Sequence, residues 1–302
     1  MTKALRNYFK AVRVTKFNCV RCTFQCPQRN RTLLLFNTLL FIFLSTMHSK
    51  VHASEPASLT MAVYPWIPWR IQHDNGSWGG IAIDTAKLVA LCTKTTITAL
   101  DVKNGKRMRK EWGRRINVES AISPMWRQSQ QTSSVYTAPL FSTSDIVFAR
   151  KGEFENVKSV KDLYGERLGV TVGYYYPEGF TEAINAGKIR TSASNTKTLL
   201  PKLLRGRLKA IIINENELLY LLKQRQYKFE YSIDDFEVIY RFEVVPLHMR
   251  VHKDYEYLIP KFNLAIEELK KRGVIQHIQS NYAVTGKSDT SVSLSECPFK
   301  AI

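Results

Sequence analysis

Short apolar runs that suit β-strands alternate with segments of helical periodicity along most of this chain. Runs of the first kind include LTMAV at 59–63, RLGVTV at 167–172 and LKAIII at 208–213. Leucines recur on one side of the segment 196–205, and Gly206 follows it, as expected for an amphipathic helix and its end. Strands that alternate with helices favour parallel pairing, because a parallel connection needs a crossover. The sequence therefore predicts an α/β fold with mainly parallel sheets.

Local signals refine this prediction. Two prolines and three aromatic residues make 64–69 a loop after the first strand. Asp84 is expected to cap a helix, because its carboxylate can accept a hydrogen bond from a free backbone N–H. Further strands are predicted at 95–102 and 244–251, and further helices at 215–224, 255–271 and 274–282. The composition agrees with a folded chain, because 44% of the 302 residues are hydrophobic and 23% are charged.

The N-terminal segment has the pattern of a secretory signal. Residues 33–44 read LLLFNTLLFIFL, basic residues precede them, and Val51-His52-Ala53 places a small residue at each cleavage-determining position. This apolar segment has 12 residues. It is too short to span a membrane, because a spanning helix needs about 20 residues. We therefore predict cleavage after Ala53 and export to the periplasm, with an uncleaved anchor as the alternative.

The net charge of +18 is concentrated in that segment. Residues 1–53 carry nine Lys and Arg and no Asp or Glu, which leaves +9 for residues 54–302. This remainder is a modest surplus and does not indicate a nucleic-acid-binding protein. Residues 103–115 carry seven basic side chains, for which a solvated helix face is favoured over an anion-binding patch.

The cysteines fall into two groups. Cys19, Cys22 and Cys26 lie in the leader, with no fourth ligand near enough to complete a metal site. Cys92 and Cys297 remain in the exported part. An oxidising compartment allows these two thiols to form a disulfide. The sequence favours neither a disulfide nor two free thiols.

Five segments, in their order, resemble the bacterial extracellular solute-binding proteins of family 3, which bind polar amino acids and supply ABC importers. The resemblance covers residues 59–282. The segments are 63–69 with 80–84, 124–127 with 136–140, 160–165 with 168–173, 203–210, and 259–282.

The resemblance implies a two-lobed periplasmic-binding-protein fold of type II. Two mainly parallel sheets flanked by helices would be joined by two crossover strands, at 144–150 and 244–250. The implied domains are a targeting segment at 1–53, a discontinuous lobe 1 at 54–143 and 246–302, and lobe 2 at 144–245.

The resemblance also implies a ligand cleft between the lobes. Arg127 matches the family's carboxylate-binding arginine, and a guanidinium group can bind both carboxylate oxygens. Tyr64, Trp66 and Trp69 would supply aromatic walls. A structural ion pair for Arg127 and lobe packing for the two tryptophans are the alternatives.

Two further ligand-binding positions depart from the family. Tyr174 stands where a small hydroxyl side chain is expected, after Gly173. Asn214 stands where many members have the acidic residue that holds an amino group, and a neutral amide cannot neutralise an ammonium group. Glu215 or Glu217 could substitute, although exposure on a helix surface is favoured for both.

The predicted function is therefore periplasmic binding of a small polar solute, an amino acid or a related carboxylate or amine, for an ABC importer. We expect a monomer that is not an enzyme and that uses no cofactor, metal or nucleic acid. Two alternatives remain open: a dehydratase- or lyase-like enzyme on the same scaffold, and a ligand-sensing partner of a membrane receptor. The histidines lack an organising catalytic motif, which disfavours the enzyme.

Overall fold

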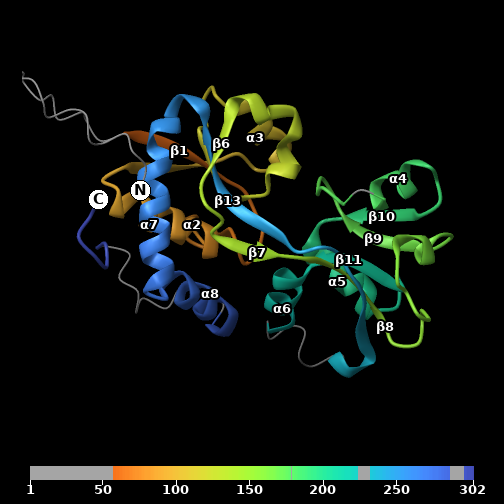
Figure 1. Cartoon of the computed structure of the whole chain (residues 1–302). Helices are drawn as coiled ribbons and strands as arrows, with labels where there is room; N and C mark the ends of the chain where they lie inside the picture. Colours follow the sequence, from red (N-terminus) through yellow and green to blue (C-terminus); the bar gives the residue numbers. More distant parts are fainter. Residues whose placement is uncertain (1–56, 178, 224–231, 286–295) are drawn as a thin grey trace, which may run out of the picture. The chain divides into compact units, whose positions relative to one another are not determined.

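A computed structural model describes residues 57–177, 179–223, 232–285 and 296–302. The predicted signal segment and its cleavage site lie outside the described residues. Strands and helices alternate as the sequence predicts, and the strands form two main sheets with six and five strands (Figure 1). Among the described residues, no helix is both long and apolar enough to cross a bilayer.

The first sheet has the strand order β4-β1-β5-β13-β6, and β7 also pairs with β13. Its strands are β1 (Ser58–Val63), β4 (Thr96–Asp101), β5 (Val118–Ile122), β6 (Ser134–Tyr136), β7 (Phe141–Thr143) and β13 (Val245–His252). β1 runs parallel to β4 and β5, whereas β13 pairs antiparallel with β5, β6 and β7. The associated helices are α2 (Ile81–Cys92), α3 (Gly105–Glu111), α7 (Ile259–Lys271) and α8 (Val274–Thr285).

The second sheet has the order β10-β9-β11-β8-β12. Its strands are β8 (Asp145–Arg150), β9 (Arg167–Thr171), β10 (Arg190–Ser194), β11 (Ala210–Asn214) and β12 (Phe236–Arg241). β9 runs parallel to β10 and β11, and β8 pairs antiparallel with β11 and β12. Its helices are α4 (Phe180–Asn185), α5 (Thr196–Leu204) and α6 (Glu215–Lys223).

Shorter elements complete the described chain. They are the hairpin β2 (Ile71–Gln72) and β3 (Trp78–Gly79), and the 3-10 segments η2 (Pro124–Ser133), η3 (Val160–Leu163), η5 (Ile233–Asp235) and η6 (Lys253–Leu258).

The chain passes between the sheets at the two predicted crossings. β7 belongs to the first sheet and β8, which follows after Ser144, belongs to the second. The return runs from β12 to β13, and Ser144 Oγ donates a 2.7 Å hydrogen bond to the carbonyl of Phe242 on that return. The boundaries of the two lobes stay a prediction.

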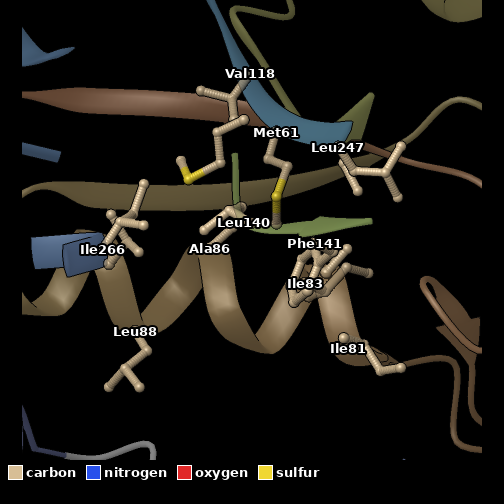
Figure 2. Close-up of a cluster of buried hydrophobic side chains, with 14 of the residues drawn as sticks. Met61, Ile81, Ile83, Ala86, Leu88, Val118, Leu140, Phe141, Leu247 and Ile266 are labelled. Atoms are coloured by element: carbon tan, nitrogen blue, oxygen red, sulfur yellow. The ribbon is translucent and has the colours of Figure 1, made fainter. Parts of the chain in front are cut away.

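A hydrophobic core lies between the first sheet and its helices. Figure 2 shows Met61 and Val118 on the strands, with Ile83 and Ala86 of α2 and Ile266 of α7. All five side chains are at most 1% exposed. Each large apolar side chain buried in this way contributes about 1.5–3 kcal/mol.

The start of α2 differs from the sequence-based expectation. Asp84 does not cap the helix: the N-cap is Gly80, and Asp84 lies in the first turn. Gly80 has a φ of 116° and lies against the chain, so that an added Cβ would stand 2.6 Å from the carbonyl oxygen of Trp69. The hydroxyl of Tyr282 accepts a hydrogen bond from the Gly80 N–H and donates one to Asp84. The prediction of an Asp84 cap is therefore wrong: the first two helical N–H groups, of Ile81 and Ala82, donate to the carbonyls of Pro68 and Trp69.

The structure decides how the two cysteines of the exported part are joined. Cys92 and Cys297 form a disulfide with a Cα–Cα distance of 5.0 Å, which ties the end of α2 to the C-terminal residues. The seven basic side chains between 103 and 115 are all exposed, which fits both a solvated face and an anion-binding patch.

Candidate functional site

The predicted residues of the first sheet gather at the carboxyl ends of β1 and β5. Tyr64 directly follows β1, and Arg127 lies in η2, which follows β5. In open α/β sheets this edge is where ligands bind, because the connecting loops can be shaped without disturbing the sheet.

Arg127 is buried and directed at a carboxylate of its own chain. Its Nε donates to Glu119 Oε2 at 3.0 Å, and its Nη2 donates to Glu119 Oε1 at 2.8 Å. Nη2 also contacts the hydroxyl of Tyr64 at 3.2 Å, and Nη1 donates to the carbonyl of Trp126. The geometry is the bidentate one predicted for a ligand carboxylate, with Glu119 in that place. Ligand binding by Arg127 stays a prediction.

Glu119 joins two arginines. Arg250 Nη1 donates to Glu119 Oε2 at 2.7 Å, and both side chains are fully buried. Burial acts to raise the pKa of Glu119, but Arg127 and Arg250 outweigh it and lower this pKa to about 2. Glu119 is therefore ionised at neutral pH.

Arg70 adds a third guanidinium group at this edge. It is 2% exposed and lies 4.1 Å from the ring centre of Tyr64 and 5.1 Å from that of Trp66. Its Nε donates to the carbonyl of Tyr64 at 3.2 Å. No ion pair within the described residues includes Arg70. Among the residues that the structure describes, Glu119 is the one carboxylate paired with any of these three arginines, which leaves an excess of two positive charges.

The two tryptophans of the aromatic loop have different surroundings. Trp69 is fully buried in the core of the first sheet, 5.2 Å from the ring of Phe141. Trp66 is 7% exposed and packs edge-on against Trp126 at 5.9 Å. Trp66 therefore lies nearer the surface than Trp69. Ligand contact by either stays a prediction.

The predicted residues of the second sheet also follow strand ends. Tyr174 lies three residues beyond the end of β9, and Asn214 is the last residue of β11. Asn214 is 2% exposed, and its Nδ2 donates to Thr143 Oγ1 at 2.7 Å and contacts Asp145 Oδ1 at 3.3 Å. Its Oδ1 is buried without a hydrogen-bond partner among the described residues.

Two carboxylates, of Asp145 and Glu217, lie at the same end of the second sheet as Asn214, and among the described residues neither forms an ion pair. Glu217, in the first turn of α6, is 2% exposed and accepts a 3.4 Å hydrogen bond from the hydroxyl of Tyr174. Burial raises the pKa of Glu217 to about 8, and the charge of Asp145 contributes to this shift. Burial likewise raises the pKa of Asp145 to about 6, although the amide of Asn214 opposes it. Glu215 differs, because it is paired with Arg241 at the surface.

Tyr174 connects the two groups of residues. Its side chain packs against hydrophobic clusters of both sheets. Burial and the charge of Glu217 raise the pKa of Tyr174 well above its usual value, whereas the charge of Arg70 lowers it. Arg70 and Glu217, which follow strands of different sheets, are thus both within electrostatic reach of one hydroxyl.

A separate hollow of about 620 Å³ lies elsewhere, at the beginnings of β1 and β5. Ser58, Asn117, Arg114 and Arg115 are among its lining residues, and none of the predicted ligand-binding residues lines it. No group of three or more His, Cys, Asp or Glu that could hold a metal ion occurs in the described part of the chain.

Sequence reasoning missed Glu119, Arg250, Arg70 and Asp145. Arg70 had a usable signal, because it directly follows the aromatic loop. Glu217 is considered from the sequence as a substitute for the acidic ligand-binding residue, but exposure on a helix surface is favoured there. Its spacing of three residues from Asn214 could have indicated that a helix turn brings both to one end of the sheet.

Comparison with solved structures identifies this class of fold. An ancestral arginine-binding protein bound to arginine matches with a TM-score of 0.61 at 20% identity, over 76% of this chain and 99% of that chain. A mutant of the arginine-binding protein ArgBP from T. maritima matches with a TM-score of 0.58 at 17% identity, over 76% and 96%. Substrate-binding domain 2 of GlnP from Lactococcus lactis matches with a TM-score of 0.53 at 18% identity, over 76% and 96%. The fold is that of the type II, two-lobed periplasmic binding proteins.

The family follows from the sequence profile of the bacterial extracellular solute-binding proteins, family 3, which matches residues 59–285. The chain belongs to this family, as the motifs predicted. Family members bind small-molecule ligands and work with ABC transporters. No curated protein sequence matches the chain significantly.

Proposed function

We propose that this protein binds one small solute that carries a carboxylate, an amino acid or a related compound, and delivers it to an ABC importer. The observation that carries the proposal is the excess of buried guanidinium groups beside Tyr64. Buried charges without counterions are costly, and a bound carboxylate would offset that cost. Arg70 is the group best placed to accept it, because Glu119 already occupies the fork of Arg127.

The aromatic residues support the same proposal. The rings of Tyr64 and Trp66 pack against the guanidinium group of Arg70. A planar anion such as a carboxylate would therefore bind to the edge of this group, where its N–H donors lie. Trp69 stabilises the loop from the core side. Tyr174 and Asn214 would then contact the solute from the second sheet. Binding works through conformation: a solute that prefers the closed form shifts the equilibrium toward it.

The remaining parts of the proposal rest on the family and its solved relatives. Relatives named for arginine and a GlnP substrate-binding domain support an amino acid as the ligand class. Periplasmic location, removal of the signal after Ala53, a monomeric state and the absence of catalysis are proposed on the same basis. N-terminal sequencing of periplasmic protein that begins near Ser54 would support export; recovery only in membranes with residues 33–44 retained would contradict it.

A thermal-shift screen followed by calorimetric titration tests solute binding. The purified protein is screened against amino acids, polyamines, opines and small organic acids. A ligand at a hundredfold excess over its Kd stabilises the folded state by about 2.7 kcal/mol. If no compound with a carboxylate binds, the proposal is wrong.

Variants then locate the carboxylate. Arg70→Ala and Arg127→Ala are each compared with Arg205→Ala, an exposed arginine at the end of α5. Loss of a desolvated charge partner weakens binding by about 2–5 kcal/mol, whereas Arg205→Ala should leave Kd unchanged. Arg70→Lys should restore binding only in part, because an ammonium group is a point charge. Trp66→Ala should weaken binding without changing charge selectivity.

A further inference from the structure

The seven basic side chains between 103 and 115 are not used by the proposed solute site. Within that stretch Glu111 is the one acidic residue of the sequence, and it pairs with Arg107 at 3.6 Å. No ion pair among the described residues includes Arg114 or Arg115, the last two cations of the stretch. Both arginines line the hollow of about 620 Å³ at the beginnings of β1 and β5. A surplus of positive charge therefore borders this hollow.

The hollow lies at the other end of the first sheet from the proposed solute site. Ser58 begins β1 and Asn117 directly precedes β5, whereas Arg127 follows the carboxyl end of β5. His252, the last residue of the antiparallel strand β13, also lines the hollow. β1 has six residues and β5 has five, and strands of this length span about 17–20 Å. The length of these strands therefore separates the hollow from a solute held beside Arg70.

The turn between α3 and β5 fixes the backbone of the two arginines. The N–H groups of Arg114 and Arg115 both donate to the carbonyl of Glu111 at 3.0 Å. Gly113, which precedes them, has a φ of 74°, and an added Cβ would stand 2.8 Å from His252 Nε2. Because hydrogen bonds and close packing hold this turn before a ligand binds, less freedom is lost on binding.

Neutral hydrogen-bond donors line the hollow beside the arginines. Asn117 Oδ1 accepts the N–H of Thr60 at 2.6 Å, so Asn117 offers a ligand the donors of its Nδ2. The lining also includes the hydroxyl-bearing side chains of Ser58 and Thr60. Among the described lining residues Asp254 is the one carboxylate, and its Oδ2 lies 3.2 Å from His252 Nδ1. Amide and hydroxyl donors around two guanidinium groups suit an anion with several acceptor oxygens.

We propose that this hollow is a second binding site, for the phosphate group of a small soluble compound or of an anionic lipid headgroup. Guanidinium groups bind phosphate through parallel N–H donors. A phosphate group has four oxygens in a tetrahedral arrangement, whereas a carboxylate has two in a plane, so phosphate fits donors that surround it.

The size of the hollow agrees with an organic phosphate. Its volume of about 620 Å³ lies within the range of about 300–1,000 Å³ that small-molecule sites occupy. A phosphate group therefore leaves room for an attached organic part. This inference does not rest on the proposed function, because none of the predicted ligand-binding residues lines the hollow.

The test uses inorganic phosphate and glycerol phosphate as soluble probes, with succinate as a carboxylate probe. Vesicles of phosphatidylcholine, with and without phosphatidylglycerol, are the lipid probes in a sedimentation assay. The purified protein is titrated at constant ionic strength while NMR follows the backbone N–H signals of Arg114 and Arg115. The soluble phosphates should shift these signals saturably, or only the vesicles with phosphatidylglycerol should sediment the protein. Both forms of binding should weaken as salt is added, because the two arginines are exposed.

Two double variants decide whether the hollow itself binds the phosphate. Arg114→Ala with Arg115→Ala should weaken binding about tenfold or more. The matched control, Lys106→Ala with Lys110→Ala, removes the same charge from exposed positions of the same stretch that do not line the hollow. This control should change Kd by less than about twofold, because surface charges at a distance are screened. Arg114→Lys with Arg115→Lys should restore binding only in part.

The outcomes identify the source of the phosphate or overturn the site. Binding of the soluble probes supports a free phosphate compound, and binding of phosphatidylglycerol vesicles alone supports a lipid headgroup. The proposal is wrong if no phosphate probe binds, if both alanine double variants lose binding equally, or if succinate shifts the same signals with equal affinity. Thermal melts confirm that the variants are folded. Amino acid binding should persist in Arg114→Ala with Arg115→Ala, so failure of this site and failure of the proposed function are distinguishable.

Discussion

The guanidinium group of Arg127 meets the carboxylate of Glu119 through two parallel hydrogen bonds, of 3.0 Å and 2.8 Å. Glu119 is fully buried and is shared with Arg250, which belongs to a strand 131 residues away. Through Glu119, Arg127 thus links η2 to β5 and β13. Arg127 also lies at the edge of the first sheet where the ligand is predicted to bind. A structural role and a ligand-positioning role are compatible, because a guanidinium held in place loses less freedom when a ligand binds.

Replacing Glu119 should strongly destabilise the protein. Glu119→Gln leaves two buried guanidinium groups without their counterion, at a cost of about 3–5 kcal/mol in the free energy of unfolding. Urea denaturation followed by circular dichroism measures this loss. Glu111→Gln is the control, since the partner of Glu111, Arg107, is 62% exposed and its pair should contribute less than about 1 kcal/mol. Equal effects in the two variants would contradict the assignment.

Glu119 should also make the protein sensitive to strong acid. Its pKa in the folded state is about 2, below the ordinary value of 4.5. The resulting stability is present above pH 4.5 and is lost as the pH falls toward 2. A series of thermal melts from pH 6 to 2 should show this fall in the wild type, with a shallower fall in Glu119→Gln.

Glu217 should have the opposite effect on the ligand-free protein. Its folded-state pKa is raised from 4.5 to about 8, so the neutral form is favoured in the folded state. This contribution is fully present below pH 4.5 and is lost as the pH rises through 8. Thermal melts from pH 4 to 9 should show a decline that Glu217→Gln flattens and Glu215→Gln retains. An unchanged profile in Glu217→Gln would show that another group titrates.

The disulfide should contribute to stability. Cys92 and Cys297 are separated by 205 residues, and closing a long loop restricts the unfolded chain. The double variant Cys92→Ser, Cys297→Ser should lose about 2–5 kcal/mol, measured by urea denaturation. Adding reductant should destabilise the wild type and leave the double variant unaffected. Thiol labelling of the denatured, unreduced protein should find neither of these two thiols free.

The hydroxyl of Tyr282 should stabilise the start of α2. Tyr282→Phe leaves the Gly80 N–H and the buried carboxylate of Asp84 without this partner, which should cost about 1–3 kcal/mol. Tyr257→Phe, at a side chain that is 64% exposed, is the matched control and should change stability by less than about 0.5 kcal/mol. Similar losses in both variants would point to a general effect of losing a tyrosine hydroxyl.

The sequence by itself determined the alternation of strands and helices, the family and the two crossings. These features depend on periodicities and short motifs, which each segment carries locally. The same local reasoning failed at Asp84, where a cap-forming residue lies in the first turn and Gly80 takes the cap position. There the carbonyls of Pro68 and Trp69 accept from the first helical N–H groups, and Tyr282, about 200 positions away, binds the Gly80 N–H and Asp84.

Only the tertiary structure decided which charges are paired. Glu215 and Glu217 stand two positions apart in one acidic helix start, and nothing in their spacing tells which is exposed. Packing of α6 against the second sheet buries Glu217 and leaves Glu215 for Arg241 at the surface. Arg127 likewise shares Glu119 with Arg250 only because β13 returns beside β5. Burial and ion pairing depend on contacts between distant segments, so they emerge only when the whole chain is folded.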